Sequence, residues 1–228
     1  MHKRFISVVV TSLLLCSCAS MPLFKSKSTK TPASEEEVAR QVVGGEATAE
    51  SNRAALQPAI QVPVPDVKPA NRVMFERALV LMQAEDWLVA ESLLAEVSQD
   101  QPELAGPWVN LAIVRRAQGH LAGAEAALAQ ALQANPHNCD ALNQLGVIAR
   151  EAGRFTDAEK HYQNCIKANP SYLEAQLNLG ILYELYMGRY GEALAAYQDY
   201  QLAQVEPDPK VNGWLIDLER RVAAVAQR

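Results

Sequence analysis

Two consecutive stretches of equal length decide the fold. Residues 105–138 are AGPWVNLAIVRRAQGHLAGAEAALAQALQANPHN, and residues 139–172 are CDALNQLGVIAREAGRFTDAEKHYQNCIKANPSY. Pro102, Pro136 and Pro170 mark the same point in three successive units of this length. A 34-residue period is the signature of a helical solenoid, whose units bury their apolar faces only by stacking.

A small residue also recurs once in each unit. Ala78, Ala112, Gly146 and Gly180 keep the same 34-residue step. A small side chain lets the two helices of a unit close tightly, and the proline stops the second helix. The pattern therefore reflects fixed positions within a repeating unit and not an abundance of small residues.

These positions resemble the pattern of the tetratricopeptide repeat family. One unit matches it at Trp108, Leu111, Ala112, Gly119, Ala124, Leu128, Ala131 and Pro136. The next unit matches it at Leu145, Gly146, Gly153, Phe155, Ala158, Tyr162 and Pro170. The resemblance implies an all-α solenoid of about four helical hairpins over residues 71–207, and it says almost nothing about the ligand.

The first and fourth units depart from the pattern. Arg77 stands where the family prefers leucine. In the fourth unit, Ala193 and Pro207 come one and three residues late, which predicts a lengthened turn around residues 187–191.

A capping helix is predicted over residues 208–228. Asp208 and Pro209 suit the cap and the first position of a helix. Apolar residues then follow at helical spacing, namely Val211, Trp214, Leu215, Leu218, Val222 and Val225. A terminal repeat needs a cap over its core edge, so we favour this interpretation over a helix that binds a partner.

The amino terminus predicts a lipoprotein signal peptide over residues 1–17. A basic start precedes an apolar run over residues 5–15, which is too short to span a membrane stably. The sequence LCSC at residues 15–18 resembles the bacterial lipobox, which implies a covalent lipid on Cys18. Cys16 fits less well because a bulky leucine precedes it. An uncleaved anchor or an ordinary secreted protein is the alternative.

The residues after Cys18 bear on location and reach. By analogy with bacterial lipoproteins, Ala19 and Ser20 lack the aspartate of inner-membrane retention, which implies anchoring to the outer membrane with the domain in the periplasm. Lysine, serine and threonine are dense at residues 25–34, and four prolines follow at residues 58–69. We therefore expect residues 18–70 to form a flexible tether around a lipidated cysteine.

Charge and motifs exclude several functions. Without residues 1–17 the chain has 19 basic and 26 acidic residues, a net charge of about −7. Nucleic acid is not an expected partner, because phosphate binding needs a basic surface. The sequence has no nucleophile elbow, phosphate loop or paired metal-binding histidines, so we expect no enzyme activity, no cofactor besides the lipid and no small-molecule substrate.

One group of cysteines and histidines lies in or just before the third unit: His137, Cys139, His161 and Cys165. Hairpin geometry places Cys139 opposite Cys165, and an oxidising periplasm would allow a disulfide. The usual spacing of packed helix axes can also hold the sulfurs out of reach, which leaves two buried thiols as the alternative. A zinc site with His161 has no recognised spacing.

Function is expected on the concave surface, because the family that the chain resembles binds peptides and proteins there. The groove-facing positions are Phe75, Leu79, Met82, Val109, Ile113, Arg116, Asn143, Val147, Arg150, Leu177, Ile181 and Glu184. Arg116 and Arg150 fall on one ladder, where they could hold a carboxylate or an acidic helix. Solvated charge that pairs with Glu151 or Glu184 is the alternative.

Tyr186 and Tyr190 are additional interface candidates, because tyrosine is enriched at interfaces. The sequence as a whole predicts a lipid-anchored adaptor that holds a periplasmic or outer-membrane protein, as pilotin-like lipoproteins do for pilus or secretion pores. An adaptor that docks peptidoglycan hydrolases is the second hypothesis. A metal-dependent enzyme at the cysteine and histidine group is the third.

Overall fold

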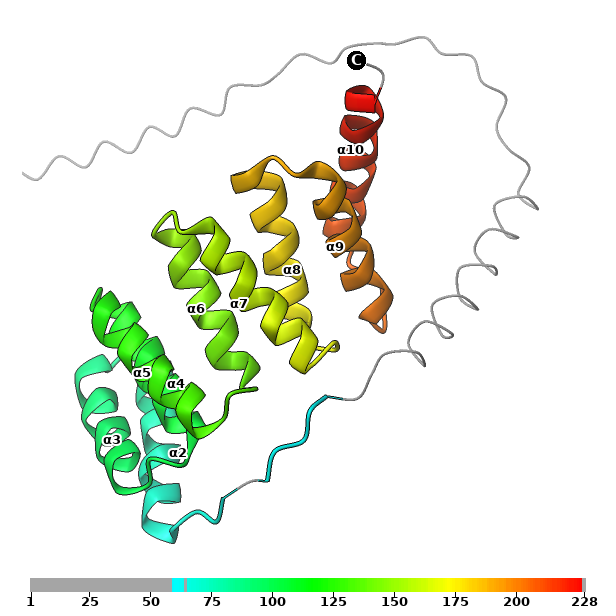
Figure 1. Cartoon of the computed structure of the whole chain (residues 1–228). Coiled ribbons are helices and arrows are strands. Elements are labelled where there is room, and N and C mark those ends of the chain that lie inside the picture. Colours follow the sequence, from blue (N-terminus) through cyan, green and yellow to red (C-terminus); the bar gives the residue numbers. More distant parts are fainter. Residues whose placement is uncertain (1–58, 64, 227–228) are drawn as a thin grey trace, which may run out of the picture. The chain divides into compact units, whose positions relative to one another are not determined.

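The computed structural model describes residues 59–63 and 65–226, and their regular secondary structure is entirely helical (Figure 1). The first helices of the four hairpins are α2 (Pro69–Gln83), α4 (Ala105–Ala117), α6 (Cys139–Glu151) and α8 (Leu173–Ile181). The second helices are α3 (Trp87–Asp100), α5 (Leu121–Ala134), α7 (Phe155–Ala168) and α9 (Tyr190–Ala203), and α10 (Pro209–Ala226) follows. The predicted all-α solenoid of four hairpins is confirmed. The signal peptide, Cys18 and most of the predicted tether lie outside the described residues.

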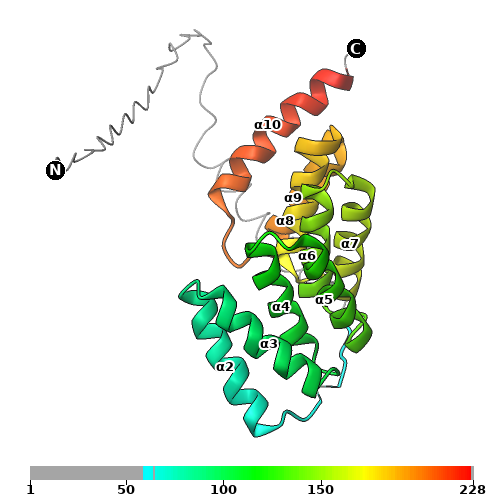
Figure 2. The same ribbon diagram turned by 90° about the vertical axis from the view of Figure 1, so that its left-hand side faces the viewer.

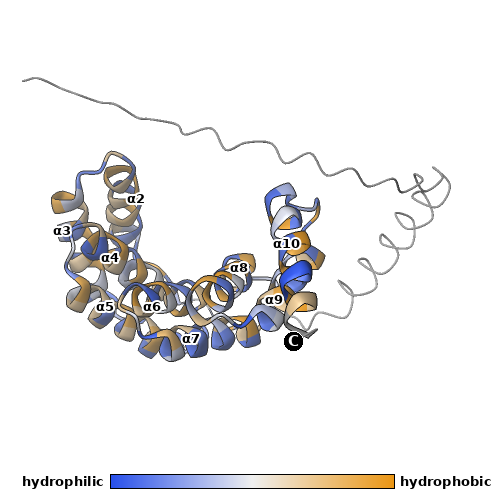
Figure 3. Ribbon diagram, turned by 90° about the horizontal axis from the view of Figure 1, so that it is seen from above, coloured by the Kyte–Doolittle hydropathy of each residue, from blue (hydrophilic) through white to orange (hydrophobic). Residues whose placement is uncertain are grey.

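Each helix packs against its neighbours in sequence, as expected for a solenoid. In the repeat domain, α4, α6 and α8 lie on the inner side of an arc, and α5, α7 and α9 lie on its outer side (Figure 3). The first helices of the hairpins therefore line the concave surface. Across residues 59–63 and 65–226, no helix combines the length and the apolar character that crossing a bilayer requires.

The small residue of each unit is matched in size to the side chain that it faces. A Cβ atom on Gly146 would lie 2.4 Å from Cε1 of Tyr162, and one on Gly180 would lie 2.4 Å from Cε1 of Tyr197. Earlier units have alanine at the glycine position and a fully buried leucine, Leu94 or Leu128, at the tyrosine position. A unit with the larger tyrosine ring thus has glycine opposite it, and a unit with leucine has alanine, because protein interiors are close-packed.

The turns inside the second and third hairpins share one geometry. Gly119 and Gly153 have φ of 81° and 74°, a left-handed conformation that glycine adopts without strain. The backbone N–H of the residue after each glycine donates to the carbonyl five residues earlier, at 2.8 Å in both turns. Each second helix then begins two residues after its glycine.

The fourth hairpin accommodates its extra residue inside the first helix. Residues Leu182–Met187 form a π-helical turn, η1, which ends at Gly188 with φ of 64°. The Arg189 N–H donates to the carbonyl of Tyr183, six residues back, and α9 again begins two residues after the glycine. The prediction of a lengthened turn at residues 187–191 was therefore wrong in its location. A π-turn absorbs one residue without disturbing the turn that follows.

The helix α10 covers the end of the last hairpin by packing against α9. Val211 and Leu218 are buried, and the ring of Trp214 lies 5.4 Å from that of Tyr197. Arg221 on the same helix lies 3.7 Å from a carboxylate oxygen of Glu184. These contacts are those of a capping helix.

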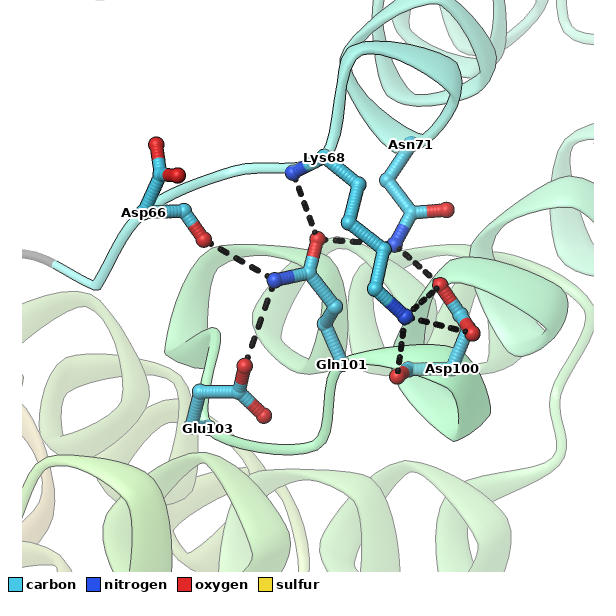
Figure 4. A network of polar contacts seen from close by, with 6 residues as sticks. All are labelled: Asp66, Lys68, Asn71, Asp100, Gln101 and Glu103. Atoms are coloured by element: carbon cyan, nitrogen blue, oxygen red, sulfur yellow. Dashed lines mark hydrogen bonds and ion pairs between the residues drawn. The ribbon is translucent and has the colours of Figure 1, made fainter.

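The segment just before α2 packs on the repeats. We call residues 59–68, without the undescribed residue 64, the strap. The Ile60 N–H donates to the carbonyl of Ala168 at the end of α7, at 2.9 Å. At the other end of the strap, the side chain of Gln101 donates to the Asp66 carbonyl and accepts from the Lys68 N–H, both at 2.9 Å (Figure 4). The composition of these residues predicts part of a flexible tether, whereas the structure places them against the ends of the first and third hairpins.

Polar side chains complete the attachment of the strap. Lys68 forms an ion pair with Asp100 at 2.9 Å, and the buried amide of Asn71 donates to both Asp100 and Gln101 (Figure 4). The hydrogen bonds from Lys68 and Asn71 lower the pKa of Asp100 below its ordinary value. Apolar residues of the strap, Val62 and Val67 among them, line a cavity of about 360 Å³ together with Phe75 and Leu104.

Candidate partner-binding groove

The apolar groove positions form a partly exposed floor. Phe75, Met82, Ile113, Val147, Leu177 and Ile181 are half-buried and pack against the core, and Leu79 is also half-buried. Val109 is buried at 5% exposure, so it belongs to the core more than to the surface that a partner would touch. The floor therefore offers aliphatic contact along all four hairpins.

Polar contacts connect neighbouring first helices along this surface. Arg116 Nη1 on α4 lies 3.0 Å from Glu151 Oε1 on α6. Asn178 Nδ2 on α8 donates to Oδ1 of Asn143 on α6, at 3.0 Å. Asn143 is itself buried, at 6% exposure. The alternative of pairing with Glu151 thus holds for Arg116, and the groove positions are coupled from one hairpin to the next.

Glu184 is engaged with the end of the solenoid. Its carboxylate accepts from the Tyr197 hydroxyl at 3.1 Å and faces Arg221 of α10 at 3.7 Å. Burial and the charge of Glu184 raise the pKa of Tyr197. Glu184 therefore holds η1, α9 and α10 together and is not a partner of Arg150.

Arg150 has no carboxylate partner among the described residues. Its guanidinium carbon lies 5.5 Å from the ring centroid of Tyr186, and that ring lies 5.4 Å from the ring of Phe155. The Nε atoms of Arg150 and Arg116 are both buried without a hydrogen-bond partner in the described chain. A partner cannot touch these buried atoms, but both arginines are only half-buried as residues, so the rest of each guanidinium group can meet an acceptor from outside.

A buried phenol lies within electrostatic reach of Arg150. Tyr162 is 0% exposed, and its hydroxyl finds no hydrogen-bond partner among the described residues. Burial raises the pKa of Tyr162 to about 12, and Arg150 opposes this shift. The phenol therefore remains a neutral hydrogen-bond donor at physiological pH, next to a cation that lacks a counter-charge.

The two tyrosine candidates differ in environment. Tyr186 is 45% exposed and stacks under Arg150, as described above. Tyr190 is half-buried, and the guanidinium of Arg221 lies 5.7 Å from its ring centroid. Tyr186 belongs to the groove, whereas Tyr190 lies against the capping helix.

The four members of the cysteine and histidine group differ in burial. Cys139 and Cys165 are free buried thiols, and the Cys139 Sγ donates to the Cys165 carbonyl at 3.1 Å. The hydrogen bond with Cys139 and burial raise the pKa of the Cys165 thiol. Burial lowers the pKa of His161, and His137 is exposed. Over the part of the chain described, no three His, Cys, Asp or Glu side chains gather closely enough to hold a metal ion. The disulfide stays a prediction.

Sequence reasoning missed the contact between Tyr186 and Arg150 and the contact between Glu184 and Arg221. Both contacts involve residues of η1, the π-helical segment Leu182–Met187. The late position of Gly188, one residue beyond the 34-residue step, was the available signal for this π-turn.

A family model described as a tetratricopeptide repeat matches residues 109–164 and again residues 145–211. The protein is a tetratricopeptide repeat protein. No curated protein matches the sequence significantly.

Solved structures share this tetratricopeptide repeat fold at low sequence identity. A Pseudomonas aeruginosa protein, pilF, is 21% identical, with a TM-score of 0.60 over 69% of this chain and 72% of that chain. MamA from Desulfovibrio magneticus RS-1 is 15% identical, with a TM-score of 0.57 over 69% of this chain and 88% of that chain. A tetratricopeptide repeat protein from Parabacteroides merdae is 22% identical, with a TM-score of 0.51 over 58% of this chain and 52% of that chain. The chain thus spans about half the length of the Parabacteroides protein.

Proposed function

We propose that this tetratricopeptide repeat protein is a lipid-anchored adaptor of the outer membrane. Its repeat domain holds an acidic segment of a periplasmic or outer-membrane protein in the groove, for the assembly of an envelope machine such as a pilus or a secretion pore. The repeat fold supports binding to proteins in general. The sequence of residues 1–18 supports the anchor, through its resemblance to lipoprotein signals.

The observation that carries the groove assignment is the unpaired guanidinium of Arg150. Arg150 has no carboxylate partner in the described chain and is only half-buried, while Glu151 and Glu184 nearby are already engaged. A partner carboxylate would supply charge-assisted hydrogen bonds to donors that are already positioned. The exposed ring of Tyr186 adds apolar contact beside that charge. We therefore expect a partner segment with a carboxylate next to an apolar or aromatic side chain.

The fold similarity to pilF favours a pilus-related machine within this proposal. An adaptor of this kind acts by tethering, because a lipid anchor raises the local concentration of the domain near its target. Cys18→Ser should abolish incorporation of a radiolabelled fatty acid. Continued incorporation by that variant would contradict the anchor assignment.

The groove is tested by crosslinking in intact cells, with a photoreactive residue at position 147 or 181. We expect one major captured protein, and we expect Arg116→Glu combined with Arg150→Glu to reduce its capture at least tenfold, because two carboxylates would then repel the acidic segment. Mass spectrometry identifies the captured protein and hence the pathway.

The control is Arg220→Glu, which makes the charge change of one groove substitution at an exposed position of α10. Capture should persist in that variant. Equal capture by the groove double variant and by the wild type would remove the binding surface from the groove, and circular dichroism of each variant verifies that the repeats are folded.

A further inference from the structure

The outward face of α2 is exposed, although it occupies repeat positions that are buried elsewhere. Val73 and Val80 have 65% and 64% of their surface exposed. Their counterparts one, two and three repeats later are all buried: Pro107, Ala141 and Ala175 for Val73, and Val114, Ile148 and Leu182 for Val80. In those repeats the face packs against the second helix of the preceding hairpin. The first hairpin has no preceding hairpin among the described residues.

The two ends of the repeat stack therefore differ. At one end, α10 covers the last hairpin, whereas the described chain places no helix over α2 at the other end (Figure 2). Between the two valines stands Arg77, whose counterparts Leu111, Leu145 and Leu179 are apolar. The face thus keeps two β-branched apolar residues and replaces the leucine between them by a charge.

The α2 face is complementary to itself when it is read in opposite directions. If two copies of α2 lie antiparallel about the midpoint between Glu76 and Arg77, Val73 of one copy faces Val80 of the other. In the same register, Glu76 of one copy faces Arg77 of the other. Neither Glu76 nor Arg77 forms an ion pair within the described chain. One symmetric contact therefore contains two Val73–Val80 pairs and two Glu76–Arg77 pairs.

We propose that α2 is a homodimer interface, in which the outward face over Val73, Glu76, Arg77 and Val80 binds the same face of a second copy in an antiparallel arrangement. Such a contact has twofold symmetry and closes upon itself. A head-to-tail contact would have to displace α10, which already covers the other end. The interface lies apart from the groove, so its test does not depend on the proposed function.

Cysteine crosslinking tests the register of this interface. Two full-length variants, Val73→Cys and Val80→Cys, are purified in detergent, mixed and oxidised with copper phenanthroline. We expect a disulfide dimer in the mixture, because residues 73 and 80 of the two copies face each other. Neither variant alone should form it. In a dimer of one variant, the two introduced cysteines would lie about 10.5 Å apart along the helix axis, which is beyond disulfide reach. Mass spectrometry of the linked peptides distinguishes this bond from any bond that involves a native cysteine.

A charge exchange tests the ion pairs. Arg77→Glu places Glu76 opposite a new carboxylate in both of the symmetry-related pairs at the centre of the contact, and we expect the dissociation constant of the dimer to rise at least tenfold in sedimentation equilibrium. The double variant Glu76→Arg, Arg77→Glu restores opposite charges and should return the constant to within about threefold of the wild type.

Three results would overturn the interface. They are equal crosslinking of the single variants and the mixture, a monomeric wild type at all accessible concentrations, and a double variant as weak as the single one. A different protein, or an earlier segment of this chain, would then be the occupant of the face.

Discussion

At the scale of single residues, the hairpins are closed by a match between one small and one large side chain. Gly146→Ala would place a Cβ atom 2.4 Å from the fully buried Tyr162 ring. Overpacking of this kind costs about 1–3 kcal/mol, which exceeds the gain of up to about 1 kcal/mol from the better helix propensity of alanine. Because a 2.4 Å contact forces the ring or the helix to move, the cost lies in the upper part of that range, about 2–3 kcal/mol, and we expect a net loss of about 1–2 kcal/mol of unfolding free energy in urea denaturation.

The compensating variant is Gly146→Ala combined with Tyr162→Leu. It reproduces the pairing of the second hairpin, in which alanine stands at the position of Gly146 and Leu128 at that of Tyr162. The pair of substitutions should recover part of the lost stability. A double variant less stable than Gly146→Ala alone would show that ring and small residue are not matched.

Asp100 makes the attachment of the strap sensitive to acid. Hydrogen bonds from Lys68 and Asn71 lower its pKa below the ordinary value of 3.8. The folded state therefore binds this proton less readily than the unfolded state, so the stabilisation is present above pH 3.8 and is lost as pH falls through the folded pKa. Urea denaturation from pH 7 to pH 2.5 should show wild type more stable than Asp100→Asn at neutral pH and equal to it at the acid end. A difference that does not change with pH would contradict this role.

At the scale of elements, η1 places Tyr186 over Arg150. Deletion of Leu185, which is 67% exposed, would convert the π-turn into regular helix. The deletion would replace the wide turn at Tyr186 by a narrower α-helical one, which changes the position of the ring relative to the guanidinium. We expect helicity close to that of the wild type in circular dichroism, together with reduced capture of the groove partner.

Tyr186→Ala is the matched control for that deletion, because it removes the ring and leaves the helix intact. Both variants should weaken capture to a similar degree. Undiminished capture by the deletion variant would show that the π-turn has no part in binding.

Most of the helical elements can be predicted from the sequence, but the π-turn and the strap cannot. The repeat period predicts the hairpins, because tight packing requires small residues and prolines at fixed positions, and the apolar spacing after Pro209 predicts the capping helix. It does not locate the extra residue of the fourth hairpin, since a late glycine is equally compatible with a longer turn and with a π-turn. The strap escaped prediction because Gln101, which holds its backbone, is distant in sequence from Asp66 and follows no repeat rule.

The candidate site was predictable only in part, for a similar reason. Repeat register placed Arg116 and Arg150 on one surface, but it could not decide which carboxylates they would meet. That outcome depends on side-chain contacts between hairpins, such as those of Glu151 and Glu184. Two positions, Val109 and Asn143, are more buried than a simple groove pattern implies.

At the scale of the whole repeat domain, stability depends on the cap. A chain that stops after Pro207 would lose the buried Val211 and Leu218 and would expose the surface of α9 that they cover. Burial of each such side chain contributes about 1.5–3 kcal/mol, so we expect a loss of about 3–6 kcal/mol and increased aggregation. A chain that stops after Arg221 keeps these contacts and serves as the control in thermal denaturation. Equal melting temperatures of the two truncated chains would contradict the capping role.

The strap determines how a mechanical pull from the amino-terminal side enters the repeats. Its first described hydrogen bond joins Ile60 to the end of α7, and its last contacts hold Lys68 beside α3, so force on residue 59 meets the third hairpin before the first. The contacts would break one after another, and sequential rupture needs less force than rupture of all contacts at once. About ten residues of strap would release roughly 33 Å of chain before tension reached α2. The strap would thus lengthen under load and delay the transmission of force from an anchor to the repeat domain.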